Sequence, residues 1–315
     1  MRKLVVKPAG GLCNRLRVID SARKLATQSE RELIVIWELN HDLNCNYRSL
    51  FLDPDFTLLQ QKRLRRWDFP SLVSKTTRNP LWDRAFKRRL QAIAPGDWSV
   101  RLLNEFSEDL ETLRPVTPER YANVTTYDKS VYRAFQRYAD QLHELDESIY
   151  WCTCWRMSDE QNYRAMFPVQ PDIQCRVDSV TEKFHEPVIG THIRGTDCRT
   201  SKDHSGTEGF FQVVEEHLAS NPTGTVFLAT DEPSIKDQMI RRFGSQIVYF
   251  EQENYARSNA RNIENALVDL LCLAKTKNIY GSYFSTFSQV AADWFGGTET
   301  TVMRNSASIV RANEQ

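Results

Sequence analysis

A chain of 315 residues, 41% of them hydrophobic, is long enough for two domains and carries enough apolar side chains to build both cores. Lys plus Arg and Asp plus Glu each number 41, so the net charge is zero and composition alone implies no charged partner. No apolar run approaches the roughly 20 residues that a membrane span needs.

The first predicted elements are those of a doubly wound α/β domain. We expect a strand at Leu4 to Lys7, a tight turn at Gly10 and Gly11, a helix from Asn14 to Thr27 and a buried strand from Leu33 to Trp37. The first strand follows Met1 so closely that we expect no signal peptide. Seven scattered cysteines, an odd number, favour a reducing, cytoplasmic location.

Residues 58–100 differ in character from the rest of the first domain. Ten Lys and Arg stand against three Asp in this stretch, and its apolar side chains have helical spacing. Trp67, Trp82 and Trp98 lie among the cations, an arrangement that base-stacking platforms also use. The stretch is therefore either a basic helical insert or a surface for nucleic acid.

The second domain is predicted from a repeated strand and helix pattern. A strand at Ile149 to Trp155 is expected to close the first domain, which spans residues 1–170, and polar residues from about 170 to 186 are interpreted as a linker. Strands are then expected near 188–193, 226–230, 247–250 and 278–282, with helices between them, in a domain of residues 171–315.

The most informative polar residues follow the strand at 188–193. Side chains alternate along a strand, so His192 and Arg194 share one face at its carboxyl end, where open parallel sheets bind ligands. The arginine fork suits a phosphate, and His192 adds a neutral donor or a cation. The alternative is an arginine that pairs with Asp197 in a tight turn.

Three further segments place polar groups where the same kind of site would need them. Asp231 ends an apolar run, Asp269 lies within a Leu-rich helix, and Ser285 and Thr286 stand at a predicted helix start whose amides form an anion site. Each also has a structural explanation: helix capping for Asp231, Ser285 and Thr286, and an exposed helical position for Asp269.

Taken together, these segments resemble the superfamily of fucosyltransferases that use GDP-fucose, which includes α1,6-fucosyltransferases, rhizobial nodulation enzymes and protein O-fucosyltransferases. The resemblance covers the first ~40 residues and residues 187–296. The matching blocks are His192-Ile193-Arg194-Gly195-Thr196-Asp197, Ala229-Thr230-Asp231-Glu232-Pro233, Asp269, Phe284-Ser285-Thr286 and Gly10-Gly11-Leu12-Cys13-Asn14-Arg15-Leu16.

The resemblance implies a GT-B architecture, two Rossmann-like domains facing a cleft, and inverting transfer of fucose to a hydroxyl of a glycan or peptide acceptor. The acceptor is expected on the side of the first domain and the donor in the second. Arg194, Glu208 and Asn14 are implied as catalytic residues. The implied donor-binding residues are Gly10, Gly11, Asn14, Arg15, His192, Arg194, Thr196, Asp197, Asp231, Asp269, Ser285 and Thr286.

Two departures from the family pattern concern the general base. One Arg of the usual pair is Gly195, and Glu208 comes several residues late, after a hydrophilic stretch from Thr200 to Ser205 that we interpret as a mobile loop. Glu208 is therefore either the base or an ordinary helix-start residue, in which case the leaving phosphate removes the proton.

No cofactor or metal is expected beside the nucleotide-sugar donor. Asp53-Pro54-Asp55 has the form by which another glycosyltransferase class holds a divalent cation, but a proline between the carboxylates favours a turn. Two other functions remain open at this point: a non-catalytic module that binds a GDP-sugar or glycan, and a protein that binds nucleic acid through the basic stretch.

Overall fold

The computed structural model describes residues 2–62, 98–99, 142, 146, 148–158, 161–195, 199–252, 255–303 and 310–311. Most of the basic stretch at 58–100 lies outside the described residues. The contacts divide the described chain into two units, residues 2–47, 53–62 and 98–161 in one and residues 48–52 and 162 onward in the other. This division falls earlier than the expected boundary at residue 170.

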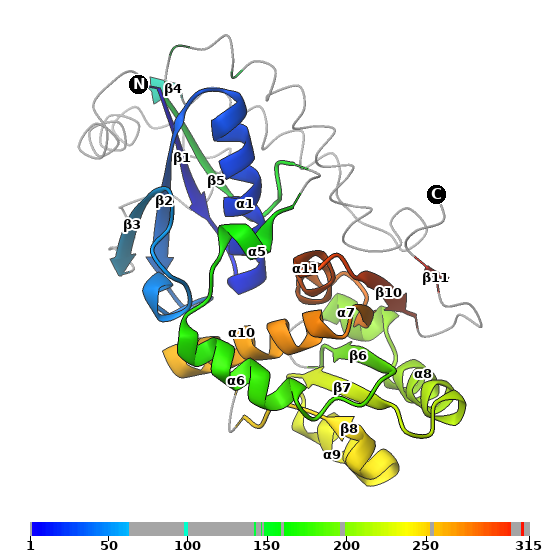
Figure 1. Cartoon of the computed structure of the whole chain (residues 1–315). Helices are drawn as coiled ribbons and strands as arrows, with labels where there is room; N and C mark the ends of the chain where they lie inside the picture. The colour runs from blue at the N-terminus through cyan, green and yellow to red at the C-terminus, as the bar shows by residue number, and fades with distance from the viewer. Residues whose placement is uncertain are drawn as a thin grey trace. The chain divides into compact units, whose positions relative to one another are not determined.

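The first unit contains a parallel sheet with the strand order β3-β2-β1-β5-β4 (Figure 1). Its strands are β1 (Lys3–Pro8), β2 (Glu32–Leu39), β3 (Thr57–Lys62), β4 (Trp98–Ser99) and β5 (Ser148–Thr153). Helix α1 (Leu12–Gln28) connects β1 to β2, and its predicted apolar positions are buried. The expected strand, turn, helix and strand at the start of the chain are confirmed.

The second unit contains a six-stranded sheet of order β11-β10-β9-β6-β7-β8. Its strands are β6 (Val188–Ile193), β7 (Thr225–Thr230), β8 (Ile247–Val248), β9 (Asn278–Ser282), β10 (Thr298–Val302) and β11 (Val310–Arg311). Its helices are α5 (Tyr163–Met166), α6 (Pro171–Thr181), α7 (Arg199–His204), α8 (Thr207–Ser220), α9 (Pro233–Phe243), α10 (Ala260–Lys275) and α11 (Thr286–Trp294), and short 3-10 turns are η1 (Tyr47–Ser49) and η2 (Gly244–Gln246). All four predicted strands are present.

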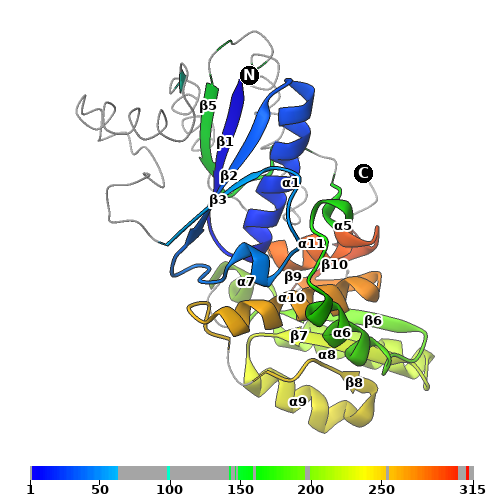
Figure 2. The same cartoon turned by 60° about the vertical axis from the view of Figure 1, so that its left-hand side comes forward.

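Helices cover both faces of this second sheet (Figure 2). Phe210 and Val214 of α8 and Met239 of α9 pack with Ile189 and Val226 in one apolar core. On the other face, a Cβ at Gly190 would come within 2.6 Å of Leu273 in α10, so this strand position requires glycine for close packing. The unit is therefore doubly wound.

Two expectations about polar segments were wrong. The presumed linker at 170–186 contains α6, because Ile173, Val177 and Val180 recur at helical spacing and are buried. The presumed loop from Thr200 to Ser205 lies largely in α7. Both segments are short and mostly polar, so their few anchoring side chains gave too weak a periodic signal.

Each sheet reverses its strand order at one point, between β1 and β5 in the first unit and between β6 and β9 in the second. Ligands of open α/β sheets bind beyond the carboxyl ends of the strands at such a switch point. The Gly10-Gly11 turn follows β1, and the His192 to Arg194 segment ends β6, so both motifs lie at these positions. No helix among the described residues is long and apolar enough to cross a membrane.

Candidate active site

The backbone after β6 is held by side chains from both neighbouring strands. The Arg194 amide donates to Ser282 Oγ of β9 at 3.0 Å, and the Ser282 hydroxyl donates to the His192 carbonyl at 3.2 Å. On the other side, the Gly195 amide donates to Asp231 Oδ1 beyond β7 at 2.6 Å. Asp231 and Ser282 therefore position the segment that carries Arg194. Helix capping alone does not account for Asp231, because its carboxylate also binds the Gly195 amide.

His192 is a buried, neutral imidazole at neutral pH. Its ring stacks on Phe287 at 4.7 Å between centroids, and its Nδ1 lies 3.4 Å from Ser285 Oγ. The pKa of His192 is lowered to about 4, chiefly by burial, while the negative charge of Asp231 raises it in part and the positive charge of Arg194 lowers it. Of the two roles expected for His192, the structure supports a neutral hydrogen-bonding group.

Gly195 is required by a close approach to Glu232. A Cβ built on Gly195 would lie 2.5 Å from the Cβ of Glu232. Real Cβ atoms do not approach so closely, so a larger residue needs a shift of Glu232 or of the backbone. The departure from the paired arginines of the resembled family therefore has a local steric cause.

The turn between β9 and α11 places backbone amides beside His192. Ser285 is the N-cap of α11 and its Oγ accepts from the Phe287 amide at 3.3 Å, and Thr286 is the first helical residue. The turn is also held from α7, because Ser201 Oγ donates to the Tyr283 carbonyl at 2.8 Å and the Tyr283 amide donates to Ser205 Oγ at 2.6 Å.

Asp269 is buried, contrary to the alternative of an exposed helical aspartate. Only 7% of Asp269 is exposed, and Gln252 Nε2 donates to its Oδ2. Burial raises the pKa of the Asp269 carboxyl well above its ordinary value, and Lys236 and Gln252 lower it in part. The pKa of the neighbouring Tyr255 is raised to about 12, chiefly by burial and then by Asp269. A polar cluster therefore surrounds Asp269.

In the first unit, Gly10 and Gly11 form the turn that leads into α1. Gly10 has φ +81°, and a Cβ there would lie 2.8 Å from Asn14 Nδ2, so only glycine fits. Gly11 is the N-cap and contributes no side-chain cap. Asn14 Oδ1 is buried and has no hydrogen-bond partner in the described part of the chain. Asn14 thus offers a hydrogen-bond acceptor at the switch point.

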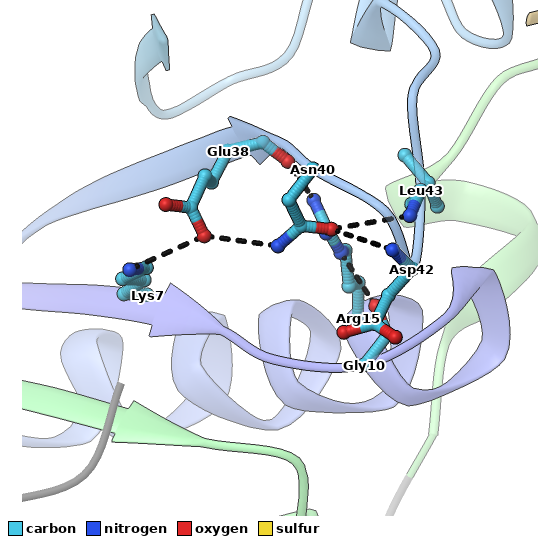
Figure 3. Close-up of polar contacts among 7 residues, drawn as sticks. All are labelled: Lys7, Gly10, Arg15, Glu38, Asn40, Asp42 and Leu43. Carbon is cyan, nitrogen blue, oxygen red and sulfur yellow. Dashed lines mark hydrogen bonds and ion pairs between the residues drawn. The ribbon is translucent and has the colours of Figure 1, made fainter. Parts of the chain in front are cut away.

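The side chain of Arg15 lies between the glycine turn and Asn40 of the loop after β2 (Figure 3). Its Nε donates to the Gly10 carbonyl at 2.9 Å, its Nη1 to the Glu38 carbonyl at 2.5 Å and its Nη2 to Asn40 Oδ1 at 3.0 Å. The residue is fully buried, and burial lowers the pKa of Arg15 to about 10. Arg15 therefore positions the glycine turn, and a direct contact with the donor stays a prediction.

Sequence reasoning did not find the polar network that surrounds Arg15 (Figure 3). Asn40 Oδ1 also accepts the amides of Asp42 and Leu43, and Asn40 Nδ2 donates to Glu38 Oε2 at 2.9 Å. The same Glu38 oxygen lies 3.3 Å from Nζ of the buried Lys7. Two features of the sequence could have indicated this network: Lys7 lies within the apolar first strand, and Glu38 comes two residues before Asn40.

The other residues predicted from the sequence are Glu208, Thr196, Asp197, Asp53 and Asp55. Glu208 lies exposed in the first turn of α8, the location of the helix-start alternative. Thr196 and Asp197 lie outside the described residues. Asp55 pairs with Arg23 at 2.7 Å, and within the described ranges no group of three His, Cys, Asp or Glu side chains has a metal-binding arrangement. The six described cysteines are free thiols.

Comparison with known proteins identifies relatives by structure alone. No family model matches the chain, and no curated protein matches it in sequence. A NodZ α-1,6-fucosyltransferase crystal soaked with GDP-fucose superposes with a TM-score of 0.59 and 17% identity, covering 96% of this chain and 95% of that one. The fucosyltransferase NodZ from Bradyrhizobium gives a TM-score of 0.59, 16% identity and 100% coverage of both chains.

A plant structure shares the same arrangement. A FUT1 mutant from Arabidopsis thaliana in complex with GDP superposes with a TM-score of 0.53 and 13% identity, covering 98% of this chain and 71% of that one. These likenesses extend over nearly the whole chain, including both sheets. The protein therefore has the GT-B fold, in the form found in these fucosyltransferase structures.

Proposed function

We propose that the protein is an inverting glycosyltransferase that transfers fucose from GDP-fucose to a hydroxyl of a glycan or peptide acceptor. The observation that carries the proposal is the convergence of Arg194, His192 and Ser285 at the switch point between β6 and β9. One NodZ crystal was soaked with GDP-fucose and the FUT1 mutant was solved in complex with GDP, and this supports the same donor here.

The chemistry of the transfer explains the roles of these groups. When the bond between fucose and phosphate breaks, negative charge grows on the β-phosphate, and preorganised cations and amides lower that barrier most. Arg194 supplies the cation, and the amides at the start of α11 supply a partial positive charge. His192 is neutral, so it contributes a hydrogen bond and does not add a second charge.

We assign guanine recognition to Asp269. Guanine presents adjacent N–H donors, and a carboxylate accepts such a pair in a forked geometry. Gln252 engages one Asp269 oxygen and fixes the orientation of the carboxylate. Because burial disfavours the charged form of Asp269, bound N–H donors would recover stability that the empty site lacks.

The acceptor is proposed to bind at the first unit. Asn14, whose Oδ1 has no hydrogen-bond partner among the described residues, stays a proposed catalytic and donor-binding residue. Glu208 remains the proposed base, with the leaving phosphate as the alternative. In Glu208→Gln, transfer to acceptor should fall far more than donor binding. Unchanged transfer would assign the proton to the phosphate.

A donor screen tests the proposal. Purified protein is incubated with GDP-, UDP- and dTDP-sugars in excess EDTA, and nucleotide release and transfer to glycan and peptide acceptors are measured. We expect turnover with GDP-fucose, unaffected by EDTA, because Arg194 and amides meet the diphosphate. Loss of activity in EDTA that Mn²⁺ restores would instead indicate that Asp53 and Asp55 bind a metal ion.

The same preparation distinguishes the two other functions. GDP binding without turnover on any acceptor would indicate a binding module. Salt-dependent binding to oligonucleotides, with no response to GDP, would indicate a nucleic-acid-binding protein, because phosphate contacts release counterions and weaken with salt.

A further inference from the structure

A cavity of about 340 Å³ lies in the second unit, where α5, α6, α10 and α11 meet. Its walls are apolar and include Phe167, Val177, Leu271 and Trp294. The volume is at the lower end of the range of small-molecule sites, so its occupant would be small.

This cavity is separate from the proposed donor site. It lies at the carboxyl end of α11, whereas Ser285 and Thr286 lie at the amino end of the same helix. On α10, Leu271 and Lys275 line the cavity, and helical periodicity puts them on the side opposite Asp269. A ligand in the cavity would therefore contact the same helices as the donor without contacting the donor residues.

Two cations line the cavity, and both lie close to the ring of Phe295. The Arg164 guanidinium carbon lies 5.6 Å from the centroid of the Phe295 ring, and Lys275 Nζ lies 4.8 Å from it. Both side chains are exposed, and no acidic residue lines the cavity. Within the described ranges, neither cation forms an ion pair.

Ordinary structural roles explain these cations only in part. Lys275 occupies the last turn of α10, where a cation is favoured by the helix dipole, and both cations gain from the Phe295 ring. Neither effect explains why two cations lie beside the same mostly apolar cavity, whose lining contains no acidic residue. Gln174, a polar residue of the lining, is neutral and uses one of its two amide hydrogens on Asp178 at 2.7 Å.

We infer that this cavity binds a small carboxylic acid with an apolar body. The carboxylate would contact Arg164 and Lys275 at the edge of the cavity, and the apolar body would contact Phe167 and Trp294. A single carboxylate matches two cations in a lining that is otherwise mostly apolar. The inference does not depend on the proposed transferase function.

The test uses 4-phenylbutyrate and its neutral counterpart 4-phenyl-1-butanol with the full-length protein. Binding is measured by isothermal titration calorimetry and by the shift in melting temperature. We expect 4-phenylbutyrate to bind with a Kd of about 1 mM or tighter, and the alcohol to bind at least tenfold more weakly. Equal binding of the acid and the alcohol, or binding of neither, would overturn the inference.

Variants locate the site. Arg164→Gln and Lys275→Gln should each weaken 4-phenylbutyrate binding about tenfold, the size expected for loss of one charge-assisted contact. Gln174→Trp should block the cavity while leaving both cations in place. Lys183→Gln, which removes an exposed cation elsewhere in the same unit, is the matched control and should bind normally. Full affinity in all three site variants, each confirmed as folded by circular dichroism, would place the ligand elsewhere.

Discussion

Arg194 and His192 have different proposed roles at the end of β6. Arg194 carries the positive charge, and its charge is one reason that the pKa of His192 is low. The backbone at this strand end is fixed by hydrogen bonds that the Arg194 and Gly195 amides donate to Ser282 and Asp231, so the side chains start from a defined position. Preorganisation of this kind is what electrostatic catalysis requires.

We predict that Arg194→Ala lowers turnover of GDP-fucose about 10²-fold or more, the usual cost of losing charge stabilisation at a developing anion. The backbone anchors at Ser282 and Asp231 do not involve the guanidinium, so the variant should fold. Arg241→Ala, on the exposed surface of α9, is the control. Near-normal turnover in folded Arg194→Ala would remove Arg194 from the mechanism.

His192 gives a prediction for pH. Its folded-state pKa of about 4 lies below the ordinary 6.5, so between these values the unfolded chain binds a proton that the folded chain does not. His192 therefore causes no loss of stability above pH 6.5 and a growing loss as the pH falls towards 4, of about 3 kcal/mol at most. Urea unfolding of the wild type and His192→Gln across this range should show a shallower pH slope in the variant. Parallel curves would contradict a neutral, buried His192.

At the scale of elements, the loop after β2 and the turn after β1 are one structural unit. Asn40 joins them, because its amide oxygen accepts from Arg15 and from two loop amides. The Gly10 turn is held by the same Arg15. A change in the loop is thereby transmitted to the turn without any contact with a ligand.

Asn40→Ala should lower the free energy of unfolding by about 1–3 kcal/mol, because it leaves a buried guanidinium without one of its acceptors. If Asn14 and the glycine turn bind substrate, the variant should also raise KM at temperatures where it remains folded. Gln28→Ala, an exposed position at the end of α1 in the same unit, should do neither. Equal stability of the wild type and Asn40→Ala would show that Arg15 alone holds the turn.

Elements with a strong apolar periodicity could be predicted from the sequence, whereas helices with few buried apolar side chains were missed. The long apolar faces of α1 and α10 and the buried strands were recognised from spacing alone. Helices α6 and α7 were missed because only a few of their side chains are apolar, and tertiary contacts such as that of Ser201 with Tyr283 hold them. Likewise, Arg15 resembled a ligand contact in sequence, and only the fold reveals that its partners are two backbone carbonyls and the side chain of Asn40.

At the scale of the molecule, each of the two sheets has a switch point beside its first strand and places one sequence motif there. If the second unit binds the guanine nucleotide at Asp269, GDP should raise the melting temperature while UDP and ADP should not, because a ligand that binds only the folded state stabilises it. Differential scanning fluorimetry with each nucleotide at equal concentration measures this. Equal shifts with all three would contradict the assignment of Asp269.

The contact between Gly195 and Glu232 makes these two positions epistatic. An arginine at 195, as in the resembled family, would collide with the Glu232 side chain, whereas a change at 232 alone creates no clash. Gly195→Arg alone should therefore impair folding or turnover, and Glu232→Ala should relieve at least part of that defect in the double variant. Evolutionary routes between the one-arginine and two-arginine forms of this site then have a preferred order, with position 232 changing first.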